Sequence, residues 1–155
     1  MSVIFKPLPT EIVRALQAGG PDAYGDPPER RFSEGTGTPC RHCLKQVAAG
    51  KPYLVVAYRP FETLQPYAET GPLFLCAETC EPAAPSGSAP EMLESPNYIV
   101  RGYNAEEQII YGTGAVTPTA EIGAQAESIF ADEAVAFVHV RSATNNCYQF
   151  RIERA

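Results

Sequence analysis

Five cysteines are the residues of this chain whose type and spacing point most directly to chemistry. Four of them form two close pairs, Cys40 with Cys43 and Cys76 with Cys80. A C-x2-C spacing lets two thiolates approach one tetrahedral metal ion. A C-x3-C spacing places both sulfurs on one side of a helical turn or at either end of a tight loop. The 32 residues from position 44 to position 75 are enough for one strand and its return, so the pairs form a candidate four-cysteine zinc site.

Other interpretations of the same cysteines stay open. His42, inside the first pair, is a substitute ligand for one of the thiolates. The segment Pro39-Cys40-Arg41-His42-Cys43 also imitates a thioredoxin-like dithiol, in which a helix N-terminus and a nearby histidine lower the pKa of a thiol. That fold needs a buried strand directly before the motif, and residues 34–38 do not read as one. The cysteines could also form structural disulfides, or serve as small apolar side chains near a core.

Cys147 and His139 form the second candidate constellation. As a nucleophile and a base they would make a thiol-dependent enzyme, with Arg141 near the anion that develops. The residues around Cys147 match neither a nucleophile elbow nor a papain-like signature. The sequence therefore leans towards a protein that is not an enzyme, with cysteine catalysis or redox chemistry as the alternative.

The hairpin register decides whether Cys147 and His139 can meet. A two-residue turn at Asn145-Asn146 places His139 opposite Ile152, on the apolar face of the last strand. A five-residue loop places His139 opposite Gln149 instead. One register slip exchanges the two faces of a strand, so both arrangements remain open.

Three arginines supply a further candidate site. Arg101, Arg141 and Arg151 lie on predicted strands and could form the floor of a pocket for a small anionic ligand, because guanidinium groups bind carboxylates through paired hydrogen bonds. The simpler interpretation is a solvated sheet face. Residues 112–114 lack the third glycine and the following helix of a dinucleotide-binding loop, and no Walker A pattern occurs.

The elements that must position these residues are mostly strands. Thr10 opens a short amphipathic helix that Gly19-Gly20 ends, and Thr117-Pro118 opens a longer one near 118–131. Residues 20–39 and 81–90 read as irregular loops because they are rich in proline and glycine. The predicted strands cover 53–58, 73–75, 98–103, 108–111, 135–141 and 148–153. We therefore predict an α+β fold, with residues 1–155 forming a single domain around a mostly antiparallel sheet.

Composition narrows the classes of partner. The chain has 155 residues, is 45% hydrophobic, and carries a formal net charge of −6. An acidic chain without a cluster of basic residues is a poor partner for nucleic acid or an anionic membrane. No apolar run is long enough to span a bilayer, and the N-terminus lacks the pattern of a signal peptide. We therefore expect a cytoplasmic protein with reduced thiols, which binds a small molecule or a protein; the oligomeric state is not specified.

With these segments laid out, the chain resembles an uncharacterised bacterial family known as domain of unknown function 1203. The resemblance covers about residues 5–155 and implies a bacterial origin and a single small domain, without an assigned activity. It rests on Pro39-Cys40-Arg41-His42-Cys43-Leu44, Ala57-Tyr58-Arg59-Pro60-Phe61, Gly71-Pro72-Leu73-Phe74-Leu75-Cys76-Ala77-Glu78, Cys80-Glu81, Arg101-Gly102-Tyr103, Val138-His139-Val140-Arg141, Asn146-Cys147-Tyr148 and Arg151-Ile152. The leading hypothesis is a binding or interaction domain with a structural zinc site, and zinc is the only cofactor that the sequence suggests.

Overall fold

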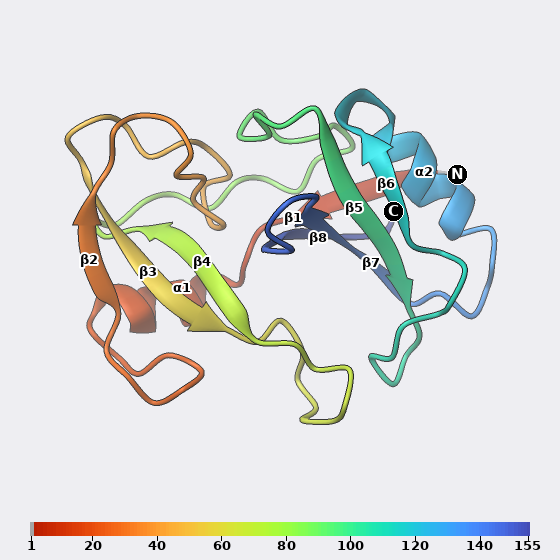
Figure 1. The fold of residues 1–155 in the computed structure, drawn as a ribbon, viewed down its shortest axis with the longest axis horizontal. Helices are drawn as coiled ribbons and strands as arrows, with labels where there is room; N and C mark the ends of the chain where they lie inside the picture. The colour runs from red at the N-terminus through yellow and green to blue at the C-terminus, as the bar shows by residue number, and fades with distance from the viewer. Residues whose placement is uncertain (1) are drawn as a thin grey trace.

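The computed structural model describes residues 2–155 and has an α+β fold built on two antiparallel sheets (Figure 1). The predicted fold class is therefore confirmed. The elements in chain order are β1 (Val3–Lys6), α1 (Thr10–Gln17), β2 (Glu29–Phe32), β3 (Pro52–Tyr58), β4 (Gly71–Cys76), β5 (Asn97–Tyr103), β6 (Ala115–Pro118), the 3-10 helix η1 (Thr119–Glu121), α2 (Ile122–Ile129), β7 (Phe137–Ser142) and β8 (Tyr148–Arg154).

The larger sheet has five strands in the order β1-β8-β7-β5-β6. The face that α2 covers forms the main apolar core, because Val138 and Val140 on β7 alternate with polar residues and point to the same side as Phe150 on β8. Ile122 and Ile129 of α2 are buried against them. The opposite face of this sheet carries polar and aromatic side chains.

Gly102 on β5 allows the close approach of α2 to the larger sheet. A Cβ atom at this position would lie 2.8 Å from Cγ2 of Ile129, which is closer than real Cβ contacts permit. A larger residue would therefore push α2 away from the sheet.

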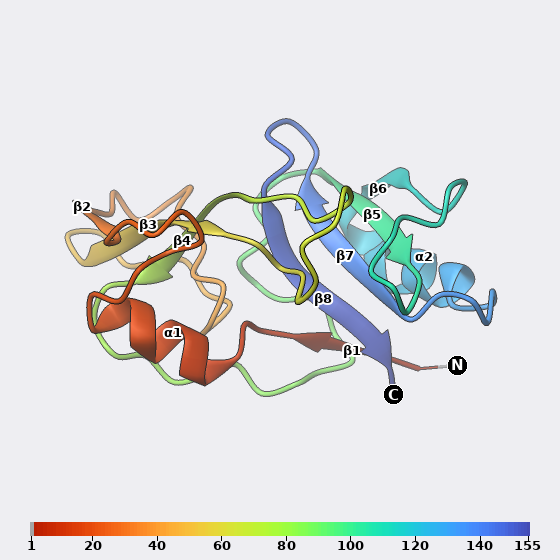
Figure 2. The same ribbon diagram turned by 90° about the horizontal axis from the view of Figure 1, so that it is seen from below.

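The smaller sheet has three strands in the order β2-β3-β4. Leu54 and Leu75 point into a second apolar cluster, which also contains Val13 and Leu16 of α1. Figure 2 shows α1 lying along this sheet, away from the larger one. The edge strand β2 is exposed along its whole length.

The β3–β4 connection joins the small sheet to the polar face of the large one. Residues 59–70 extend from the end of β3 towards β7 and β8 (Figure 2). Phe61 in this connection packs on Tyr103 and His139, with ring centroids 5.4 and 5.2 Å away. The connection therefore covers part of the face that carries the candidate arginines.

Three local differences from the sequence predictions have clear causes. The strand β2 lies inside residues 20–39, which we expected to be wholly irregular, because Glu29–Phe32 pairs with β3 despite its polar composition. Thr117-Pro118 ends β6 instead of opening a helix, so the predicted helix near 118–131 begins as η1 and continues as the shorter α2. Strand β6 also replaces the predicted strand at 108–111, of which only Ile109 forms an isolated bridge.

The register of the last hairpin matches neither predicted arrangement. Its connection has five residues, 143–147, but a bulge between Val140 and Arg141 shifts the pairing. Arg141 therefore pairs with Tyr148, and His139 pairs with Arg151. The bulge breaks the strict alternation that both predictions assumed, and it brings these four side chains to the polar face of the sheet.

None of the helices within residues 2–155 is long and apolar enough to cross a membrane.

Candidate functional site

The first cysteine pair lies on a small hairpin between β2 and β3. The backbone N–H of Cys40 donates to the carbonyl of Lys45 at 2.9 Å, and the N–H of Leu44 donates to the carbonyl of Cys40 at 2.9 Å. Leu44 has a φ of 56°, a left-handed conformation that usually favours glycine. This tight turn folds Cys43 back towards Cys40, as a metal-binding knuckle requires.

The second pair reaches the first because β3 and β4 form a hairpin. Cys76 is the last residue of β4, and Cys80 follows it in the next loop. Cys40 lies beside β4 in a parallel bridge with Phe74. The N–H of Cys76 donates to Sγ of Cys40 at 3.3 Å. The edge of the small sheet therefore holds the two pairs together.

The four sulfur atoms are spaced as ligands of a single metal ion. All four lie within 4.8 Å of one another, with Cys40 and Cys80 4.0 Å apart and Cys43 and Cys76 3.9 Å apart. A zinc–sulfur bond of about 2.3 Å gives a tetrahedron with edges of about 3.8 Å. Each of the cysteines is a free thiol in the described chain, and disulfide sulfurs would be about 2.05 Å apart. The predicted gathering of the four sulfurs is confirmed, and the cluster can hold a metal.

Hydrogen bonds among the four thiols shift their pKa values in opposite directions. Hydrogen bonds from Cys43, and then from Cys76 and Cys80, hold the pKa of the Cys40 thiol far below its usual value. The pKa values of the Cys76 and Cys80 thiols are raised, first of all by their hydrogen bonds with Cys40. Anionic sulfur at the buried centre of a thiol cluster is the charge that a metal cation would neutralise.

His42 lies beside the cluster and does not replace a cysteine in it. Its Nδ1 is 3.1 Å from Sγ of Cys80, and its Nε2 is 2.9 Å from the hydroxyl oxygen of Thr10. The side chain is fully buried. A histidine held between a helix hydroxyl and a sulfur of the cluster can orient that sulfur, as outer groups around metal sites do.

Two polar side chains of α1 hold the loop of the second pair. Nε2 of Gln17 donates to the carbonyl of Cys76 at 2.9 Å and to that of Glu78 at 3.0 Å, and Nη2 of Arg14 donates to the carbonyl of Cys80 at 2.8 Å. Sequence reasoning missed both residues. The available signal was their spacing of three, which places them on one face of the helix.

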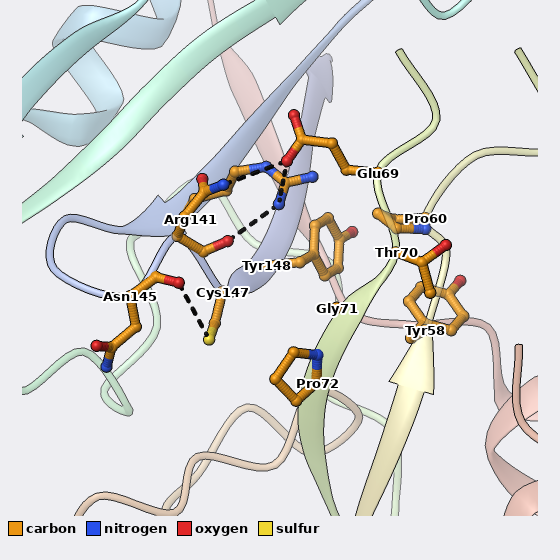
Figure 3. A pocket seen from close by; sticks show the side chains of 11 residues that line it. Tyr58, Pro60, Glu69, Thr70, Gly71, Pro72, Arg141, Asn145, Cys147 and Tyr148 are labelled. Atoms are coloured by element: carbon orange, nitrogen blue, oxygen red, sulfur yellow. Dashed lines mark hydrogen bonds and ion pairs between the residues drawn. The ribbon is translucent and has the colours of Figure 1, made fainter. Parts of the chain in front are cut away.

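Cys147 and His139, the second predicted group of chemical residues, do not come together as the four cysteines do. Sγ of Cys147 lies 3.7 Å from the carbonyl of Asn145 (Figure 3), whereas both ring nitrogens of His139 lack a hydrogen-bond partner among residues 2–155. Burial, together with the charge of Arg141, holds the pKa of His139 well below its usual value. Cys147 and His139 therefore do not form a hydrogen-bonded nucleophile–base pair.

The three predicted arginines lie on one face of the larger sheet but have different partners. Arg101 and Arg141 both contact the carboxylate of Glu69, at 3.1 and 3.4 Å. Arg151 pairs with Glu153 and lies over the ring of Phe137. Arg141 is the most buried of the three, with only 4% of its surface exposed.

Comparison with known proteins identifies a family but no function. The family model described as "Protein of unknown function (DUF1203)" matches residues 37–154, a segment that contains all five cysteines. Neither the curated proteins nor the solved structures contain a match to the chain.

Proposed function

The chain belongs to the DUF1203 family, which supplies no activity to carry over, and we propose from the geometry that it is a small binding domain whose three-stranded sheet is held by a structural zinc ion. Its ligands are the thiolates of Cys40, Cys43, Cys76 and Cys80. The observation that carries this proposal is the spacing of the four sulfurs, all within 4.8 Å of one another. The localisation that fits reduced cysteines is the cytoplasm.

A structural role fits the donor set better than a catalytic one. Structural zinc sites have four protein ligands, whereas catalytic zinc sites keep one position open for water or substrate. Here four thiolates would complete the coordination of one ion, and His42 contacts Cys80 from outside the four sulfurs. The metal would link the hairpin at 39–46 to the end of β4 and to the loop that α1 holds.

The small sheet has a structural need for such a link. Its edge strand β2 is wholly exposed, and the long segments on either side of β3 contain little regular structure. A metal ion adds free energy of folding at the place where it joins such segments, because the site does not exist in the unfolded chain.

Metal analysis of the purified protein tests the proposal. We expect about one equivalent of zinc per chain when the protein is prepared without added metal. Replacement by Co²⁺ should produce intense thiolate-to-metal charge-transfer bands and the visible bands of a tetrahedral ion. A Cys147→Ser variant is the matched control, because it lacks one thiol but retains the four ligands.

Three results would overturn the zinc proposal. Less than about 0.1 equivalent of metal, with unchanged thermal stability in a chelator, would leave only thiols packed as small apolar groups. Iron in place of zinc would indicate an electron-transfer centre. Mass spectrometry that detects Cys40–Cys80 and Cys43–Cys76 disulfides in freshly prepared protein would identify a covalent framework instead.

A further inference from the structure

A second site lies where the β3–β4 connection meets the last hairpin. A pocket of about 200 Å³ is enclosed by the beginning of β4 on one side and by Arg141, Cys147 and Tyr148 on the other (Figure 3). Ligand pockets are usually about 300–1,000 Å³. The volume therefore fits a small molecule or one end of a larger one.

Arg141 is the charged group in the wall of this pocket, and its hydrogen bonding is incomplete. Its Nη1 donates to the carbonyl of Asn146 at 3.2 Å and contacts Glu69 at 3.4 Å. Its Nε and Nη2 have no partner within the part of the chain that the structure describes. Both nitrogens are fully buried in this structure, so this fork, which can bind both oxygens of a carboxylate, is reached from the pocket only when the Arg141 side chain turns towards it. Buried N–H groups without a partner in the chain are costly, so they indicate a partner from outside it, an ordered water or a ligand.

The charge around Arg141 favours an anion. Among the described residues that line the pocket, Glu69 is the only one with a carboxylate. It contacts Arg101 at 3.1 Å, Arg141 at 3.4 Å and the side-chain amide of Asn146 at 3.2 Å. Arg101 lies outside the lining of the pocket but shares Glu69 with Arg141, so these three side chains together carry a net charge of +1. The rings of Tyr148 and Pro72 supply apolar surface beside it (Figure 3).

We propose that this pocket binds the carboxylate group of a small organic acid, with Arg141 as the anchor and Tyr148 and Pro72 contacting the apolar part. The site shares no residue with the metal centre, so the two proposals can fail separately. It also gives the buried guanidinium a function that the fold alone does not explain.

Cys147 provides a reporter inside the same pocket. Its thiolate can displace iodide from iodoacetate or iodoacetamide, so that a carbon–sulfur bond forms while the carbon–iodine bond breaks. Iodoacetate carries the carboxylate that Arg141 should bind, and iodoacetamide is its neutral counterpart. The rate at Cys147 is followed by mass spectrometry of its peptide, and N-acetylcysteine serves as the reference thiol.

We expect the iodoacetate-to-iodoacetamide rate ratio at Cys147 to exceed that of the reference thiol about tenfold, because a positively charged pocket concentrates anions. Millimolar benzoate should protect Cys147 from alkylation, and the neutral benzamide should not. Arg141→Gln should return the ratio to the reference value, whereas Glu69→Gln, which removes the negative charge, should maintain or increase it.

The competition experiment uses the wild-type protein, so it decides the matter even where Arg141→Gln fails to fold. A ratio equal to that of the reference thiol, without protection by benzoate, would overturn the proposal. Protection by inorganic phosphate but not by benzoate would also overturn it, because the ligand class would then be a phosphate. A zinc content of one equivalent in the same sample shows that either failure concerns the pocket alone.

Discussion

The larger sheet presses one face against α2 and buries Val100, Val138 and Phe150 completely, whereas the smaller sheet has α1 on one face and an edge strand that is entirely exposed. The cluster of cysteines belongs to the smaller sheet, where Cys40 is part of the apolar cluster and Cys76 ends β4. The two halves of one small chain therefore use different sources of stability. Apolar burial dominates in the first, and the proposed metal ion would supplement it in the second.

The two sheets also differ in the irregular backbone that joins their strands. Within the large sheet, β7 and β8 are joined by the five residues 143–147, and β5 and β6 by the longer connection 104–114. The small sheet contains the long segment between β2 and β3, and this is the segment that carries the first cysteine pair. A metal link would allow such a segment to be ordered without a large core of its own.

Removal of a ligand from the cluster should produce the largest effect. In Cys40→Ser we expect loss of the bound metal and opening of the small sheet, because structural zinc contributes about 10–16 kcal/mol in zinc-finger peptides and a whole domain is stable by only about 5–15 kcal/mol. Hydrogen exchange should show lost protection in β3 and β4, with β5 and β7 still protected. Equal protection of both sheets in Cys40→Ser and in the Cys147→Ser control would contradict this.

Truncation of a buried side chain in the core of the larger sheet should lower the stability of that half of the molecule. Phe150 is fully buried, and its ring lies 5.4 Å from that of Phe5. We expect Phe150→Ala to lower the free energy of unfolding by about 3–5 kcal/mol while the metal content stays unchanged, as measured by urea denaturation and metal analysis. Phe32→Ala on the exposed strand β2 is the control and should cost less than about 0.5 kcal/mol. Similar losses in the two variants would show that the halves do not differ.

A smaller effect is expected where α1 holds the loop of the second cysteine pair. Gln17→Ala removes donors to the carbonyls of Cys76 and Glu78, and each such hydrogen bond contributes about 0.5–1.5 kcal/mol. We expect faster release of the metal to a chelator, with the stability of the large sheet unchanged. Glu11→Ala, at an exposed position of the same helix, should release the metal at the wild-type rate. An unaltered rate in Gln17→Ala would show that the hydrogen bonds of Gln17 do not help to retain the metal.

The smallest expected effect is the pH dependence that His139, on the larger sheet, gives to the free energy of unfolding. Burial, followed by the charges of Arg141, Arg151 and Arg101, holds the pKa of His139 well below 6.5. Below pH 6.5 the unfolded chain therefore takes up a proton that the native chain does not, and stability falls as the pH decreases, by at most about 1.4 kcal/mol per pH unit. Chemical denaturation between pH 7 and 5 should give a shallower decline for His139→Phe than for the wild type. Parallel curves would mean that His139 titrates normally.

The sequence was sufficient for the part of the site that depends on hairpins. The apolar runs of β3 and β4 predicted two strands joined by a return, and antiparallel strands of that kind bring Cys43 and Cys76 to the same end of the sheet. The amphipathic stripe of α1 was also readable, because Val13 and Leu16 repeat on one face.

The rest of the fold and of the candidate sites depends on features that leave no pattern in the neighbouring sequence. The strand β2 consists of exposed residues, three of them charged, so only pairing with β3 identifies it. The bulge beside Arg141 shifts the hairpin register, and an alternation pattern does not contain such an extra residue. The pocket around Arg141 combines the β3–β4 connection with the last hairpin, which are distant in the sequence.

Arg41 stands between Cys40 and His42 in the chain and yet points away from the sulfurs, with its Nε donating to the backbone carbonyl of Tyr148 at 2.8 Å. Burial lowers the pKa of its guanidinium to about 10, so it keeps its charge at neutral pH. The hairpin at 39–46, which carries the first cysteine pair, is therefore hydrogen-bonded to the first residue of β8. This hydrogen bond couples the position of the cysteine segment to that of the last hairpin, which belongs to the other sheet.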